Sequence, residues 1–185
     1  KRILVEFVSA NPTGPLHVGH GRGAAYGDVL VRVLRAAGYD AASEYYINDA
    51  GRQMDILAVS VFLRYLELCG EEFEFPDNAY QGDYVFDIAA SLHRDLGEDL
   101  RQPLNAVTGS LPADGDQLLD TLILRAKTLL GKERFTQIHD LARDTLVDDI
   151  RKDLSQFRVT FDHWFSENTL VTGNAVARAV EKLTG

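Results

Sequence analysis

The sequence has few sulfur-containing residues, with one cysteine (Cys69) and one methionine in 185 residues. A single cysteine excludes a disulfide framework and deprives a structural zinc site of its usual thiolates. No apolar run approaches the ~18 residues that a membrane-spanning helix requires. The opening residues, KRILVEFVSANP, lack the long apolar region and cleavage site of a signal peptide. We therefore expect a cytoplasmic chain without membrane contacts.

Positive charge is also scarce, because 19 basic residues face 28 acidic ones and leave a net charge of -9. This balance argues against a surface that binds nucleic acid as a whole. The excess is local: residues 71–120 contain 12 acidic and 2 basic residues. A basic partner would suit this acidic stretch, but a solvated surface is the simpler interpretation. At 45% hydrophobic residues, the chain has enough apolar material for a core.

The apolar periodicity predicts strands at 3–8 and 41–47 and helices at 18–37 and 53–68. Strand and helix alternate, which is typical of a parallel α/β sheet. Further helices are expected over 84–96, 118–130, 133–154 and 174–183, and a returning strand over 157–161. A largely helical insertion of about 90 residues would then separate two parts of one sheet. Because Lys1 directly precedes a strand and Gly185 directly follows a helical pattern, we also expect an excised piece of a longer chain.

The segment after the first strand, Asn11 to Gly23 (NPTGPLHVGHGRG), contains two histidines three residues apart at a predicted helix start. Open α/β sheets bind ligands at the carboxyl ends of their strands. Amide N–H groups at a helix start favour anions there, and glycines let phosphates approach the backbone. His17 and His20 could both donate hydrogen bonds to phosphate oxygens. Taken alone, such a pair is more often a pair of plain surface residues, and a metal site lacks a third ligand.

The run NPTGPLHVGH resembles the HIGH signature of class I aminoacyl-tRNA synthetases, with valine in the second position. SANPTGPLHVGH followed by YINDAGRQ resembles the arginyl-tRNA synthetases in particular. YQGDY at 80–84 and FDHWFSE at 161–167 fit the same family, and the resemblance is weakest over 96–134. It implies a Rossmann-like parallel sheet, of which residues 1–68 form the first half. Residues 69–155 would be the helical acidic insertion, and residues 156–185 would return to the catalytic sheet.

The resemblance also implies a reaction: L-arginine is activated with ATP, accompanied by Mg²⁺, to arginyl-adenylate and then transferred to tRNA(Arg). His17 and His20 match the catalytic histidines. They would bind ATP together with Gly14 and Gly19. No protein metal ligand is implied.

For arginine, the resemblance assigns the guanidinium to Glu6 and the amino-acid end to Asn11, with Ser9 nearby. Four further residues follow the second strand and could take part, although turn chemistry explains the segment equally well: Tyr46, Asn48, Asp49 and Gln53. Ser166 and Glu167 are weaker candidates for the pocket wall. We interpret His93, His139 and His163 as structural or surface residues.

One expected feature is absent from these residues. The second class I signature, a KMSKS-like lysine loop, has no match; the nearest lysines, Lys127 and Lys132, lie in the helical stretch without the pattern. We therefore expect the segment by itself to be inactive. Two alternatives stay open: a compact nucleotidylyltransferase with the same HxGH chemistry, and a non-catalytic relative of a synthetase. Another class I specificity is also possible, although a carboxylate at Glu6 favours a cationic substrate.

Overall fold

The computed structural model describes residues 1–184 as two compact units, which we treat separately. Unit 1 contains Lys1–Ala50 and Val147–Gly185, and unit 2 contains Gly51–Leu146. Within the described residues, no helix combines the length and apolar character needed to cross a bilayer.

Unit 1 is built on a parallel sheet of three strands in the order β1-β2-β3. The strands are β1 (Arg2–Glu6), β2 (Asp40–Ile47) and β3 (His163–Ser166). This confirms the predicted α/β class and the return of the chain to the same sheet after the helical stretch. Because all three strands are parallel, their carboxyl ends lie at one edge.

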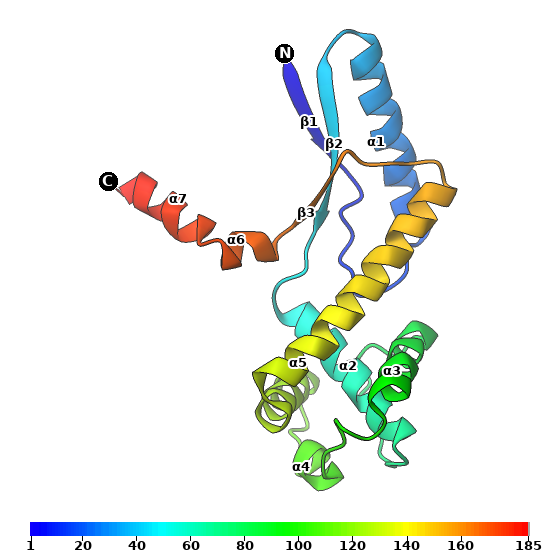
Figure 1. The fold of residues 1–185 in the computed structure, drawn as a ribbon, viewed down its shortest axis with the longest axis vertical. Helices are drawn as coiled ribbons and strands as arrows, with labels where there is room; N and C mark the ends of the chain where they lie inside the picture. Colours follow the sequence, from blue (N-terminus) through cyan, green and yellow to red (C-terminus); the bar gives the residue numbers. More distant parts are fainter. Residues whose placement is uncertain (185) are drawn as a thin grey trace. The chain divides into compact units, whose positions relative to one another are not determined.

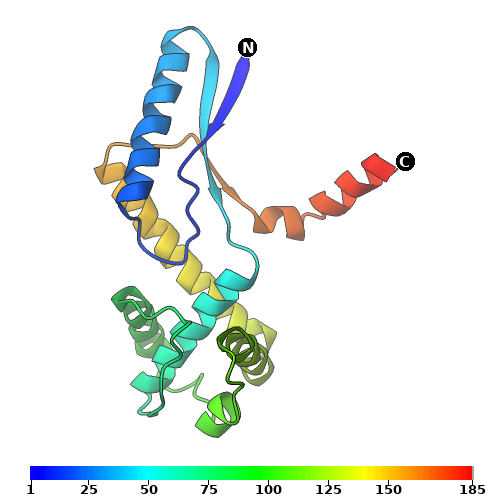
Figure 2. The same ribbon diagram turned by 180° about the vertical axis from the view of Figure 1, so that it is seen from behind.

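One face of this sheet is covered and the other is open. On β2 the alternate residues Ala41, Ser43, Tyr45 and Ile47 are buried. They face α1 (Val18–Ala36) and the last turns of α5 (Gly115–Gln156), which contribute Ala24, Val147, Ile150 and Leu154 to the same core. The opposite face leaves Leu4 57% exposed. The two views in Figures 1 and 2 show α6 (Asn168–Thr172) and α7 (Ala175–Thr184) extending away from the sheet.

Gly27 allows α1 to approach the end of β1 closely. A Cβ atom at Gly27 would lie 2.1 Å from the ring of Phe7. No side chain larger than hydrogen fits there, so the glycine brings the amino-terminal half of α1 against the strand end. This contact helps to place the start of α1 beside the carboxyl edge of the sheet.

Unit 2 is helical and has its own core. It contains α2 (Arg52–Leu68), α3 (Asp83–Leu96), α4 (Leu104–Thr108) and α5 up to Leu146. Helix α2 is buried on nearly all sides by α3 and α5. Gly131, at φ 72°, interrupts α5 where the sequence predicted a break between two helices. The predicted boundaries at 68 and 155 differ from these units, since α2 packs within the helical core and residues 147–156 pack against the sheet.

The predicted strand over 157–161 is wrong, and the strand begins at His163 instead. Residues 157–159 form the turn that follows α5: the amide of Val159 donates to the carbonyl of Leu154, and Arg158 has φ 63°. The alternating apolar pattern of FRVTF therefore reflects a helix end packing back on its own last turn. The sequence also missed the short helices α4 and α6.

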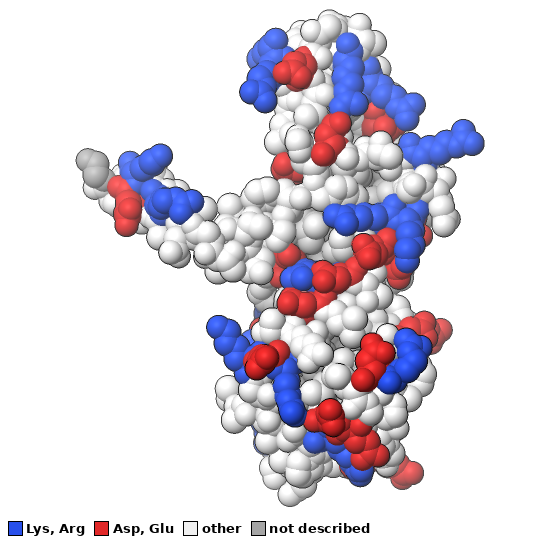
Figure 3. Space-filling view, in the orientation of Figure 1, with Lys and Arg blue, Asp and Glu red and all other residues white. Residues whose placement is uncertain are grey.

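Part of the acidic stretch of unit 2 is paired with arginines. Arg101 bridges Glu71 and Glu98, and Arg52 bridges Asp116 and Asp120. Figure 3 shows basic and acidic side chains interspersed over the visible side of this unit. This pattern fits the solvated-surface interpretation better than a continuous acidic face.

Candidate active site

The chain leaves β1 through a tight, strained turn that sets up the loop before α1. The amide of Ser9 donates to the carbonyl of Phe7 across Val8, which has φ 66°. A three-residue turn with positive φ at a β-branched residue is rare and costs of order 1–3 kcal/mol. The surrounding contacts hold it: Val8 packs against the core, and Ser9 Oγ accepts a hydrogen bond from the amide of Tyr46 at 3.1 Å. The end of β1 is thus tied to β2.

The loop continues through Asn11 and Gly14, both half-buried around the buried Pro12. The amide of Thr13 donates to the carbonyl of Asn11, and the hydroxyl of Tyr45 donates to the carbonyl of Ala10 at 2.9 Å. Burial raises the pKa of Tyr45 to about 12, so its hydroxyl stays a donor at neutral pH. Side chains from the sheet therefore shape the backbone of this loop.

The two histidines lie together at the start of α1. Their rings stack at 3.8 Å between centroids, with 23° between planes. His17 is the residue that caps the helix, and His20 occupies its first turn. His17 is exposed, and His20 is half-buried. Burial lowers the pKa of His20, and the neighbouring His17 lowers it further.

Tyr46 lies on the open face of the sheet, near several carboxylates. Partial burial raises the pKa of Tyr46, and so do its hydrogen bond to Glu167 and the charges of Glu6 and Asp49. Glu6 is exposed at the end of β1, and Phe165 lies beside Tyr46 with ring centroids 5.7 Å apart. The face thus combines negative charge with two aromatic rings, a setting suited to a flat cation.

Asp49 ties the ends of β2 and β3 together. It is 3% exposed, and it accepts hydrogen bonds from Ser166 Oγ at 2.6 Å and from the amide of Asn168 at 2.9 Å. Glu167 lies between these two donors. Turn chemistry and a substrate role were both open for Asp49, and the structure shows it as a buried brace that holds the segment carrying Glu167.

The remaining predicted residues are distributed between the units. Asn48 is half-buried in the turn after β2, in unit 1. Gln53 is exposed in the first turn of α2, in unit 2. Two hollows lie away from the predicted residues: one of about 390 Å³ inside unit 2, and one beside Leu4 and Asp40 at the other end of the sheet.

Comparisons with known proteins agree with this architecture. Residues 1–77 match the family "tRNA synthetases class I (R), catalytic domain". The class that fold and sequence define is therefore the class I aminoacyl-tRNA synthetases.

Individual relatives indicate which class I synthetases the chain resembles most specifically. The arginine–tRNA ligases of Thioalkalivibrio sulfidiphilus and Legionella pneumophila (strain Paris) are 53% and 52% identical over 99% of this chain. A crystal structure from Campylobacter jejuni, described as an arginyl-tRNA synthetase, superposes with a TM-score of 0.72 at 31% identity. It matches 98% of this chain and 34% of its own. Over nearly its whole length the chain is similar to arginine–tRNA ligases, and it spans about a third (32%) of the length of these curated relatives.

Proposed function

We propose that the chain supplies the first part of the catalytic site of an arginine–tRNA ligase. In this reaction the carboxylate of L-arginine attacks the α-phosphate of ATP, giving arginyl-adenylate and pyrophosphate. The arginyl group then passes to the 3′ end of tRNA(Arg). The observation that carries the proposal is the set of carboxylates near Tyr46. These carboxylates lie at the carboxyl edge of the sheet, where the loop that leads to His17 and His20 also begins.

Each side of the site has its own task. Glu6 would accept hydrogen bonds from the guanidinium, with Tyr46 beside it. Ser9, Asn11 and Asn48 would line the rest of the arginine site. His17 and His20 would donate to phosphate oxygens, where a preorganised donor is worth roughly 2.7–4 kcal/mol in the transition state. Gly14 and Gly19 would let the nucleotide approach the backbone, while the role of Gln53, in unit 2, stays a prediction.

Mg²⁺ would arrive with the ATP. Within residues 1–184, no group of three or more His, Cys, Asp or Glu side chains is placed to hold a metal ion. At nucleotide sites Mg²⁺ usually keeps several waters and binds the substrate phosphates with one or two carboxylates. We further propose that residues 1–185 alone do not complete the reaction, since the lysine loop implied by the family is not among them. A cytoplasmic location stays a prediction.

Arginine binding tests the proposal directly. We expect L-arginine to shift the amide signals of Glu6, Ser9 and Tyr46 in an isotopically labelled chain. Citrulline, which has the same shape without the charge, should not. Glu6→Gln should weaken arginine binding by about tenfold or more, because a charged hydrogen bond contributes about 1.5–3 kcal/mol.

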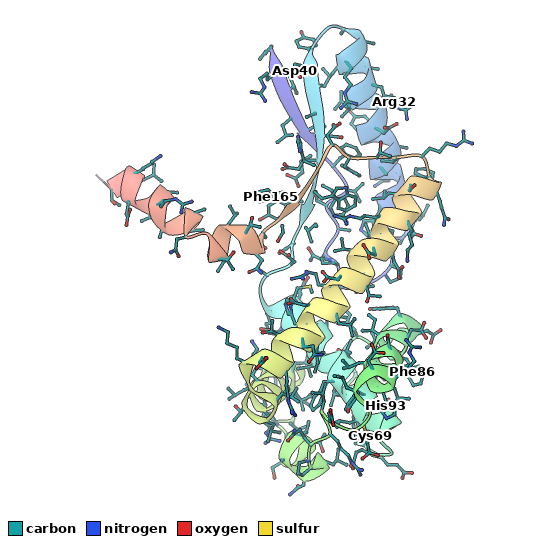
Figure 4. The ribbon with its side chains drawn as sticks, in the orientation of Figure 1. Arg32, Asp40, Cys69, Phe86, His93 and Phe165 are labelled. Carbon is teal, nitrogen blue, oxygen red and sulfur yellow. The ribbon has the colours of Figure 1, made fainter. Side chains whose placement is uncertain are left out.

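Asp40→Asn is the matched control. Asp40 lies on the same open face at the amino-terminal end of β2, where Figure 4 labels it, and it pairs with Arg2 at 3.5 Å. This variant should bind arginine normally. Equal binding of arginine and citrulline, or unchanged binding in Glu6→Gln, would contradict the assignment of Glu6.

A further inference from the structure

The two histidines at the start of α1 cap the helix reciprocally through their Nδ1 atoms. The amide of Gly19 donates to Nδ1 of His17 at 3.1 Å. The amide of His17 donates to Nδ1 of His20 at 3.2 Å. Two backbone N–H groups at the start of the helix are therefore satisfied by imidazole nitrogens, in positions where serine, threonine or carboxylate side chains usually serve.

These hydrogen bonds fix where the imidazole protons reside. An Nδ1 atom that accepts a hydrogen bond must carry a lone pair, and a neutral imidazole then holds its single proton on Nε2. We infer that His17 and His20 are held as neutral imidazoles with Nε2–H donors, and that Gly19 is the residue that positions His17. Protonating either ring would place an N–H against a backbone N–H and break the cap.

Gly19 is essential to this arrangement because it leaves room for the ring. A Cβ atom at position 19 would lie 2.9 Å from Cε1 and 3.0 Å from Nδ1 of His17. Contacts this short require the His17 imidazole to shift from the position in which it accepts from the Gly19 amide. A Cβ atom at Gly21, two residues further along the same helix, would have no heavy atom within 4 Å apart from its chain neighbours and the backbone of its own helix. The two glycines therefore form a matched pair.

The stacking of the rings argues, independently of the cap, against both imidazoles being charged at the same time. With centroids 3.8 Å apart, two charged imidazolium rings would repel each other. The lowered pKa of His20 agrees with this arrangement. For the proposed function, on which this step rests, the cap presents two Nε2–H groups to phosphate oxygens without any need for prior protonation.

Nitrogen NMR of the full 185-residue chain, selectively labelled at histidine, tests the inference at neutral to mildly alkaline pH. We expect a single tautomer at His17 and His20, with a non-protonated Nδ1 and a protonated Nε2. We also expect couplings across the hydrogen bonds from the Gly19 amide to His17 and from the His17 amide to His20. His163, exposed on β3, serves as the reference for an imidazole that caps no helix. The variant His17→Asn identifies which signals belong to His17.

The glycine pair separates positioning from folding. Gly19→Ala should abolish the coupling to His17 and return its ring to a mixture of tautomers like that of His163. Gly21→Ala, which makes the same change in helix propensity, should keep the signals of the unsubstituted chain. Tautomer mixtures at His17 and His20 in the unsubstituted chain, or identical spectra for the two variants, would overturn the inference.

Titration with ATP then tests the proposed function separately. ATP should shift the Nε2–H signals of both histidines in the unsubstituted chain and in Gly21→Ala. A fixed tautomer without any response to ATP would support the cap and count against the phosphate role. A response to ATP with mixed tautomers would support the phosphate role and contradict the cap.

Discussion

At the scale of single residues, the site depends on polar side chains whose partners are backbone amides. Ser9 holds Tyr46, Asp49 holds Asn168, and the two histidines hold the first turn of α1. Such bonds define positions sharply because the backbone groups themselves are fixed by strand and helix. The strained turn at Val8 persists in this setting because neighbours on both sides determine its path.

Replacing Asp49 with asparagine tests this bracing. The asparagine oxygen can still accept from the Asn168 amide if the side-chain N–H₂ donates to Ser166 Oγ, but the negative charge that strengthens both hydrogen bonds is lost. We expect unit 1 to lose about 1–3 kcal/mol of unfolding free energy. Urea unfolding followed by the fluorescence of Trp164, the single tryptophan of the chain and part of the unit 1 core, measures it.

Asp40→Asn provides the comparison, because it makes the same chemical change at an exposed ion pair. It should alter stability by less than about 0.5 kcal/mol. If both substitutions cost the same, Asp49 is not a brace.

At the scale of secondary-structure elements, Asp162 joins three of them just before β3. Its Oδ2 accepts hydrogen bonds from the amide and the hydroxyl of Ser43 on β2, both at 2.7 Å, and pairs with Arg35 of α1 at 2.6 Å. The hydroxyl of Ser43 also accepts from the Asp162 amide at 3.0 Å. This clamp fixes the register with which β3 enters the sheet.

The clamp predicts a dependence of stability on acid pH. The hydrogen bonds from Ser43, first of all from its amide, lower the pKa of Asp162 from its ordinary 3.8, and Arg35 adds to this. The ionised carboxylate therefore stabilises the fold fully above pH 3.8, and this contribution is lost as the pH falls through the lowered value. Asp162→Asn should cost about 1–2 kcal/mol at neutral pH, kept small because 41% of the side chain is exposed.

Urea midpoints of the two proteins, measured by Trp164 fluorescence across acid pH, check this expectation. The difference between them should shrink below pH 3.8. A constant gap down to pH 2 would mean that the charge of Asp162 is not what stabilises the clamp.

Local pattern was enough to predict β1, α1, β2 and α2 to within about two residues, because their apolar periodicity and bounding glycines act within each element. It failed at 157–161, where Arg158 adopts a positive φ that the pattern does not encode. The histidine pair was predictable from its spacing at a helix start, but its reciprocal capping depends on side-chain geometry. The roles of Asp49 and Asp162 could not be predicted, since their partners lie 117 and 119 residues away.

At the scale of the whole molecule, the two units differ in the size of their cores. Among the described residues, the unit 2 core contains 26 buried members and the unit 1 core contains seven. Buried apolar surface is the main source of stability, so unit 2 should be the more resistant. The predicted fold class did not reveal this difference in core size, because the difference depends on whether α2 packs in the core of unit 1 or of unit 2.

Urea should therefore unfold the units in sequence. Trp164 fluorescence, which reports on unit 1, should change at lower urea than the helical circular dichroism, most of which comes from unit 2. Leu122→Ala, at a fully buried position of unit 2, should move only the second transition, by about 2–5 kcal/mol. Coincident curves in the unsubstituted chain would show that the units unfold as one.

The pairing of β2 with β3 also has a consequence during synthesis. Contacts that join Ser43 to Asp162 close a loop of 119 residues, at an entropic cost of about 4 kcal/mol for an unstructured chain. Until the ribosome has released that whole stretch, β2 presents an unpaired edge and Tyr45 lacks the ring of Trp164 that stacks on it. A nascent chain of this family thus carries an unfinished sheet for most of this segment's translation, and early folding of the helical unit shortens the search that completes it.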